Sequence, residues 1–152
     1  MAGDRDDIAE ALARLPALEG AQPRVVDWLV DHVEPVTFSP GQRLVTEGDD
    51  DRDCYLLVDG DVSVSKDGGF RDTDHGGGIT GELALLYRRP RTATATAVAP
   101  VTALRLRAAD FDELCRTDPA LGRAAAEAIV DYLRFRFGFQ PPGRWEPPAS
   151  PY

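Results

Sequence analysis

The sequence has 152 residues, of which 43% are hydrophobic and 28% charged, the composition of one soluble globular domain. Its formal net charge of -9 argues against a general nucleic-acid surface, because such a surface needs Lys and Arg to neutralise phosphates. No apolar run approaches the ~18 residues of a membrane span. The acidic start MAGDRDDIAE lacks the basic end and apolar run of a signal peptide. We therefore expect a cytoplasmic protein that contacts neither nucleic acid nor membrane.

Two helices are predicted before any strand. Residues 4–15 place acids in the first turn and apolar side chains at helical spacing, and Pro16 ends the segment. Residues 22–32 carry Pro23 at an early helical position and a second apolar face. We assign residues 1–32 to N-terminal helices.

From Val33 the pattern changes to short extended segments separated by turn residues. The expected strands are residues 36–38, 43–46, 54–58 and 62–64, followed by 92–97 and 101–106. Residues 66–80 are rich in glycine and poor in apolar anchors, so they are expected to be an irregular loop. Short strands with frequent turns predict a small antiparallel barrel or sandwich.

Residues 81–97, GELALLYRRPRTATATA, combine a turn, an acid and an arginine ahead of a strand. Backbone N–H groups in a helical turn, joined by the guanidinium of Arg91, suit a phosphate. The carboxylate of Glu82 only accepts hydrogen bonds and therefore suits a sugar hydroxyl. The stretch predicts a pocket for a sugar phosphate.

This stretch resembles the phosphate-binding cassette of cyclic nucleotide-binding domains of the catabolite activator protein and kinase regulatory subunit type. The matching residues are Gly81, Glu82, Leu83, Ala84, Leu85, Pro90, Arg91, Ala93 and Ala95. The resemblance implies an α+β fold over residues 33–138, in which an antiparallel β-roll, a jelly-roll-like double-stranded β-helix, is flanked by N-terminal and C-terminal helices. Thr80 departs from the family pattern, which usually has an apolar residue before the cassette glycine.

The resemblance also implies a set of ligand-binding residues, which are Gly81, Glu82, Leu83, Ala84, Arg91, Thr92 and Ala93. Glu82 is expected to accept a hydrogen bond from the ribose 2′-hydroxyl, and Arg91 to bind the phosphate. Thr92 bears on the base, because in relatives that prefer cyclic GMP a threonine at this place can reach the guanine amino group. Bacterial-type members with a hydroxyl there also take cyclic AMP, so both remain open and we favour cyclic AMP.

Two further helices are predicted at residues 108–115 and 118–137, before a proline-rich tail, residues 139–152, that is expected to be extended or disordered. In the family an apolar residue of the C-terminal helix, or beyond it, covers the base. The candidates for this lid are Tyr132, Phe135, Phe137 and Trp145. Phosphate capture is then expected to draw the C-terminal helix over the base, which makes the domain a sensor acting on an unknown protein partner.

No catalytic residue, metal site or cofactor other than the ligand is expected, because no nucleophile motif occurs and His32 and His75 are the only histidines. The acidic residues 49–53 lack the spacing of a calcium loop and are interpreted as a solvated hairpin tip. Two alternatives stay open: a degenerate module that binds a protein but no nucleotide, and a metal-dependent cupin enzyme. A homodimer through the apolar C-terminal helix is compatible with the sequence.

Overall fold

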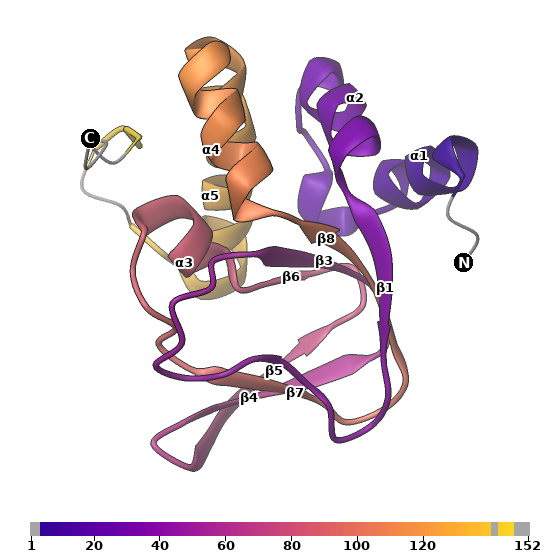
Figure 1. Cartoon of the computed structure of the whole chain (residues 1–152), viewed down its shortest axis with the longest axis vertical. Helices are drawn as coiled ribbons and strands as arrows, with labels where there is room; N and C mark the ends of the chain where they lie inside the picture. The colour runs from indigo at the N-terminus through magenta and orange to yellow at the C-terminus, as the bar shows by residue number, and fades with distance from the viewer. Residues whose placement is uncertain (1–3, 141–142, 148–152) are drawn as a thin grey trace.

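A computed structural model describes residues 4–140 and 143–147 as two facing antiparallel sheets with helices packed mainly at one end (Figure 1). The helical elements are α1 (Arg5–Ala13), the 3-10 turn η1 (Pro16–Leu18), α2 (Pro23–His32), α3 (Glu82–Tyr87), α4 (Ala108–Thr117) and α5 (Pro119–Phe137). The strands are β1 (Glu34–Phe38), β2 (Arg43–Val45), β3 (Cys54–Asp59), β4 (Asp61–Lys66), β5 (Gly69–His75), β6 (Ile79–Thr80), β7 (Thr94–Ala97) and β8 (Val101–Leu106).

Each sheet has four strands, in the orders β1-β8-β3-β6 and β2-β7-β4-β5. The strand pairs of both sheets are antiparallel, including β3 with β8 and β4 with β7. Because consecutive strands alternate between the two sheets at several points, the chain winds into a roll. This architecture confirms the predicted α+β fold with a β-roll between flanking helices.

The run Cys54–Val58 is continuously apolar because both faces of β3 are buried. Cys54 and Leu56 belong to the core formed with the helices, whereas Tyr55 and Leu57 belong to the core inside the roll. Helices pack on one face of this sheet and the second sheet packs on the other, so β3 contributes side chains to two cores.

The glycine-rich segment, residues 66–80, is more regular than its composition indicated. It contains β5 and β6, and β5 pairs with β4 along its whole length. Asp67 (φ 52°) and Gly68 (φ 78°) form the hairpin turn, and an Asp-Gly pair with two positive φ angles is the usual signal for one. The expected loop is wrong because β5 is an edge strand, which needs few apolar side chains.

Part of the proline-rich tail is packed rather than extended. Trp145 is 4% exposed, its Nε1 donates to the Leu86 carbonyl oxygen at 3.3 Å, and its ring meets Phe111 edge to face. The disorder expected for residues 139–152 is therefore wrong for 143–147, because one large aromatic finds a place in the helical core. Of the other residues of that expectation, 139–140 are also described, with Phe139 packed against the helical core, whereas 141–142 and 148–152 lie outside the described residues.

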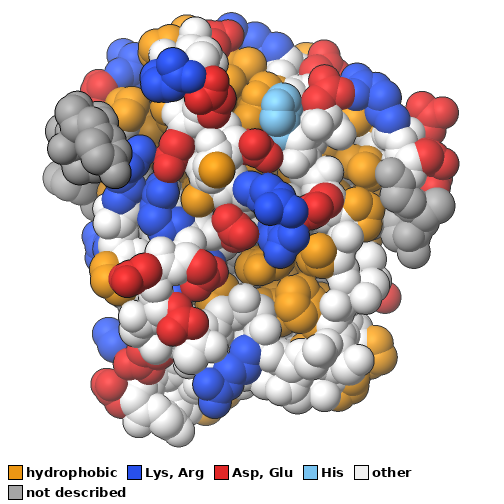
Figure 2. Space-filling view, in the orientation of Figure 1, with side chains coloured by type: hydrophobic (Ala, Val, Ile, Leu, Met, Phe, Trp, Pro, Cys, Tyr) orange, Lys and Arg blue, Asp and Glu red, His pale blue; other side chains and the backbone are white. Residues whose placement is uncertain are grey.

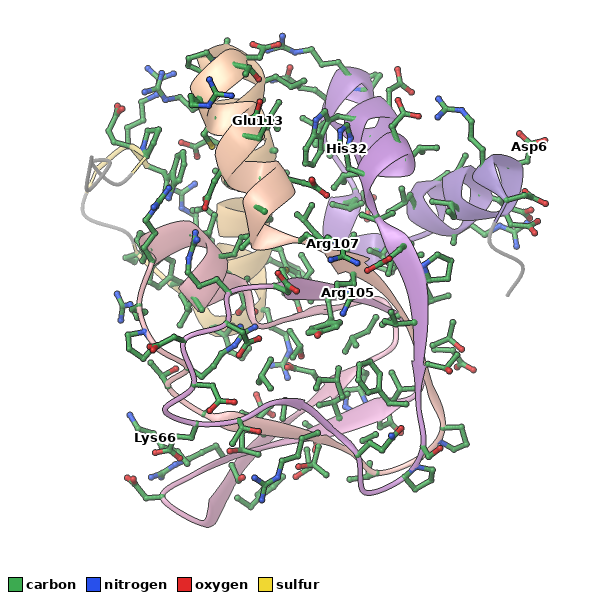
Figure 3. The ribbon with its side chains drawn as sticks, viewed as in Figure 1. Asp6, His32, Lys66, Arg105, Arg107 and Glu113 are labelled. Atoms are coloured by element: carbon green, nitrogen blue, oxygen red, sulfur yellow. The ribbon has the colours of Figure 1, made fainter. Side chains whose placement is uncertain are left out.

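The outer surface carries charges of both signs. Figure 2 shows basic and acidic side chains interspersed over one face. Arg105 and Arg107, labelled in Figure 3, both contact the carboxylate of Glu34 where β8 meets β1. Within the described residues no helix has the length and apolar character needed to cross a membrane.

Helices α4 and α5 meet at a glycine. A Cβ on Gly122 would lie 2.9 Å from both Cα and Sγ of Cys115. Such a contact is shorter than packed side chains allow, so the two helices approach this closely only because residue 122 has no side chain.

We predict that Gly122→Ala lowers thermal stability. Overpacking costs about 1–3 kcal/mol, and the better helix propensity of alanine offsets about 1 kcal/mol of it. Gly69→Ala is the matched control, because its Cβ would meet only the Lys66 carbonyl oxygen, at an ordinary 3.6 Å. Thermal denaturation of both variants tests this, and equal melting temperatures would contradict the tight crossing.

Candidate ligand-binding site

The start of α3 depends on Gly81. Gly81 caps the helix with φ 86°, a left-handed conformation that favours glycine. A Cβ at this position would lie 2.7 Å from Nη1 of Arg91 and 3.1 Å from the carbonyl oxygen of Asp53. The backbone N–H groups of Leu83 and Ala84 in the first turn have no acceptor within the helix. The first turn of α3 therefore has N–H groups without helical acceptors, on residues that line the same cavity as Arg91.

Arg91 is buried, with only 2% of its side chain exposed, and its guanidinium binds the protein at several points. Nε and Nη2 donate to the carboxylate of Asp51 at 3.4 and 2.7 Å. Nη2 also donates to the carbonyl oxygen of Asp53 at 2.5 Å, and Nη1 to that of Gly81 at 2.9 Å. These bonds use four of the five guanidinium N–H groups, so the position of Arg91 is tightly fixed.

The acidic loop, residues 49–53, holds the cassette arginine. In addition to the Asp51 contact, the carbonyl oxygen of Asp49 accepts the backbone N–H of Arg91 at 2.8 Å. The Asp53 carboxylate accepts the backbone N–H of Ala108 at the start of α4, at 2.9 Å. Interpreting the loop as no more than a solvated hairpin tip is therefore wrong, because its partners come from segments ~40 or more residues away that sequence spacing cannot show.

Arg52 links the cassette to α4. Its Nε and Nη2 donate to the carbonyl oxygens of Ala84 and Leu85 at 2.9 and 2.8 Å, which satisfies acceptors of the short helix α3. Its Nη1 also pairs with Asp112 of α4 at 2.8 Å. A movement of α3 would therefore change the contacts of α4 through the side chain of Arg52.

Glu82 is nearly inaccessible to solvent, with 9% of its surface exposed. Burial, reinforced by the negative charge of Asp74 and opposed by Arg91, raises the pKa of Glu82 to about 7 from its ordinary value of 4.5. A carboxyl whose pKa lies near neutrality can either donate a hydrogen bond to a polar group that enters the site or accept one from it.

The predicted cassette residues line one cavity of about 350 Å³. They are Gly81, Glu82, Leu83, Ala84, Arg91, Thr92 and Ala93. Apolar side chains of the wall come from the roll (Val45, Val64 and Ala95) and from the C-terminal segment (Leu133, Phe137 and Phe139). Polar and charged side chains of Arg71, Asp72, Asp74 and Thr80 also line it. A wall that combines charged groups with apolar side chains suits a ligand with a charged part and a flat apolar part.

Of the lid candidates, only Phe137 lies on the cavity. Phe135 is 91% exposed and lines a different surface groove. Tyr132 places its hydroxyl over Gly78, where a Cβ would come within 2.6 Å, and Trp145 is in the helical core. The other candidates therefore lie away from this cavity, and for Tyr132 and Phe135 helical spacing alone could not show which aromatic faces the roll.

Several cavity residues were missed by the sequence analysis. Arg71, Asp72 and Asp74 come from β5, which was expected to be a loop, and Phe139 comes from the tail. The Asp67-Gly68 pair, which is a hairpin signal, was the available signal for this strand. It was obscured because the flanking glycines suggested an irregular segment.

We predict that Glu82 makes the protein less stable as pH rises. Between pH 4.5 and about 7 the folded protein keeps a proton that the unfolded chain has lost, so folding is favoured at the acid end. The loss across this window is roughly 3 kcal/mol, and Glu82→Gln should abolish most of it and be the more stable protein at pH 8. Urea denaturation between pH 5 and 8 measures this, with the exposed Glu113→Gln as control; parallel profiles for Glu82→Gln and the parent would contradict it.

Comparison with known proteins agrees with this geometry. A family model described as cyclic nucleotide-binding domain matches residues 35–118. The cAMP-dependent protein kinase regulatory subunit of Dictyostelium discoideum is 30% identical over 131 residues, which cover 81% of this chain and 37% of that protein. A cGMP-dependent protein kinase of Drosophila melanogaster is 33% identical over 100 residues, 62% of this chain and 9% of that protein.

Among solved structures, a cyclic nucleotide-binding domain from Methylobacillus flagellatus KT superposes with a TM-score of 0.76 and 23% identity, covering 90% of this chain and 82% of the other. That likeness supports the fold. The chain spans less than two fifths of the length of either kinase-related relative. Because the family match extends over more than half of the sequence and includes the cassette, the chain belongs to the cyclic nucleotide-binding domain family.

Proposed function

We propose that this domain is a sensor that binds a cyclic mononucleotide in the cavity and transmits binding through α5 to a protein partner. The observation that carries the proposal is that Glu82 and Arg91, nine residues apart in sequence, are both buried and line one cavity. A carboxyl for a sugar hydroxyl and a guanidinium for a phosphate are the two groups that a ribose cyclic phosphate needs.

The apolar part of the cavity wall suits a purine base. Val45 and Val64 of the roll face the same space as Leu133 and Phe137 of α5. A base held between these side chains would be shielded from water on both faces, and an aromatic ring adds a stacking partner. The ligand would then lie with its phosphate on the cassette and its base against α5.

Helix α5 is the natural route for the signal, because it forms part of the cavity wall. Nη2 of Arg136 donates to Oδ2 of Asp72 and to the carbonyl oxygen of Thr73, both at 3.0 Å, which fastens the helix to β5. A nucleotide that changes the packing of Phe137 would therefore alter how α5 rests on the roll. The effect on a partner is then set by the difference in affinity between the two helix positions.

The choice of base is proposed from the relatives. The Dictyostelium protein is named for cAMP and matches 81% of this chain, whereas the Drosophila kinase is named for cGMP and matches 62%. We place cyclic AMP first for this reason. Thr92 lines the cavity and carries a hydroxyl, so cyclic GMP is the competing ligand to be measured beside it.

One observation favours the competing proposal of a module that binds a protein and no nucleotide. The carboxylate of Asp51 already accepts two hydrogen bonds from the guanidinium of Arg91. A phosphate must therefore use the remaining N–H group or displace a carboxylate that is paired at 2.7 Å. If it can do neither, the fold would serve protein contacts alone.

Calorimetric titration with cyclic AMP and with cyclic GMP tests the sensor. We expect saturable binding in the parent protein and a loss of about 30-fold or more in Arg91→Ala, because removing a partner of a buried charge costs about 2–5 kcal/mol. Arg91→Lys keeps the charge but not the fork of donors, and should also bind more weakly.

Arg89→Ala is the matched control, since Arg89 is exposed, is not part of the cavity wall and should leave affinity unchanged. Circular dichroism establishes that each variant is folded. A folded parent that gives no heat with either nucleotide would refute the sensor and support the protein-binding module.

We predict that Asp51→Asn binds the cyclic nucleotide more tightly than the parent. The change removes the negative charge that competes with phosphate for Arg91, while the Gly81 and Asp53 carbonyl oxygens still hold the guanidinium. The expected gain is roughly 3- to 10-fold, equivalent to about 1 kcal/mol.

Asp50→Asn makes the same charge change at the neighbouring exposed position of the loop, so it separates local competition from net charge. Titration of both variants measures the difference. Weaker binding by Asp51→Asn would mean that Asp51 positions the arginine instead of competing with its ligand.

A further inference from the structure

A second buried carboxyl, that of Asp74 on β5, lies on the wall of the same cavity as Glu82. Asp74 is 7% exposed. Its Oδ2 accepts a short hydrogen bond from the hydroxyl of Thr80, at 2.5 Å. Its Oδ1 has no hydrogen-bond partner among the described residues. Buried polar atoms are nearly always paired, so an unpaired carboxyl oxygen on a residue of the cavity wall calls for an explanation.

The cation with the strongest effect on Asp74, Arg136, does not bind this oxygen. Arg136 is close enough to favour the charged form of Asp74, yet its Nη2 binds Asp72 and the Thr73 carbonyl oxygen instead. Burial outweighs the opposing effects and raises the pKa of Asp74. For stability alone an apolar residue would serve better at this position, because a buried acceptor without a donor opposes folding. Sites where a sequence departs from the best choice for stability are commonly functional ones.

We propose that Asp74 is a specificity-determining residue of this pocket, whose unpaired carboxyl oxygen accepts a hydrogen bond from an O–H or N–H group of the bound nucleotide. The inference rests on the proposed function, since the donor is a group of a ligand bound in the cavity. A site built around a buried acceptor discriminates sharply against an analogue that lacks the donor, because binding the analogue leaves the acceptor unpaired.

Two donors of a cyclic purine nucleotide could meet this oxygen, the ribose 2′-hydroxyl and the exocyclic amine of the base. The surroundings favour the hydroxyl. A hydroxyl has one hydrogen to donate, so when Asp74 accepts it, Glu82 contacts the hydroxyl oxygen as a donor in its protonated form, which its raised pKa of about 7 makes available. Asp74 is bonded to Thr80, which directly precedes Gly81 and Glu82, and the charge of Asp74 acts on Glu82. Asp74 and Glu82 thus lie toward the same end of the cavity. Thr80, which departs from the apolar residue expected at its place, is part of this polar pair.

The test compares Asp74→Val with the parent protein by calorimetric titration. The probes are cyclic AMP, 2′-deoxy cyclic AMP and the cyclic monophosphate of purine riboside, which lacks the amine. We expect Asp74→Val to bind cyclic AMP at least ~10-fold more weakly while its unliganded melting temperature stays equal or rises. The parent should bind the 2′-deoxy probe more weakly than cyclic AMP, and this difference should shrink in the variant.

Asp74→Asn keeps the size of the side chain and one acceptor oxygen, so it should be folded and retain more affinity than Asp74→Val. If the difference that shrinks is the one for the amine-free probe, the inference holds and the donor is the base amine. Equal cyclic AMP affinities in the parent and Asp74→Val would overturn the inference and leave the sensor intact. Equal weakening for all three probes, with a lower melting temperature, would also overturn it, by showing a packing defect. A parent that binds none of the probes would overturn the proposed function itself.

Discussion

The buried guanidinium of Arg91 is the interaction on which the rest of the site depends. A buried charge is costly unless it is paired and hydrogen-bonded. Here Asp51 supplies the opposite charge, and the carbonyl oxygens of Gly81 and Asp53 take further N–H groups. This set of acceptors brings together the acidic loop and the cassette glycine around Arg91. It also explains why residue 81 must be glycine, since a Cβ would meet the guanidinium at 2.7 Å.

Two arginines then join the cavity to the helices that surround it. Arg52 binds the end of α3 and Asp112 of α4, and Arg136 of α5 binds Asp72 and the Thr73 carbonyl oxygen of β5. Helix α5 adds Leu133 to the cavity wall itself. A ligand in the cavity would therefore contact α5 directly, and its effect on this helix would need no long chain of contacts.

Much of the fold could be predicted because its signals are local. The glycine, acid and arginine of the cassette occupy fixed positions in one short stretch, and the amphipathic helices and the main strands follow from their periodicity. Edge strand β5 was missed because a strand paired on one side only needs few apolar residues, and its glycines suggested a loop. Which aromatic residue of α5 borders the cavity could not be predicted, because Tyr132, Phe135 and Phe137 lie on one helix and helical spacing does not show which of them faces the roll.

The family, the cassette and its residue types could be recognised from the sequence, since all of these lie within contiguous stretches. The pairing of Asp51 with Arg91 and the contact of Asp74 with Thr80 are visible only in the folded protein. The same holds for the placement of Phe137 and Phe139, and not Tyr132 and Phe135, on the cavity wall. The physical reason is that the partners of a buried charge, and the face that a helix turns inward, are set by packing between distant segments, which spacing along the chain does not record.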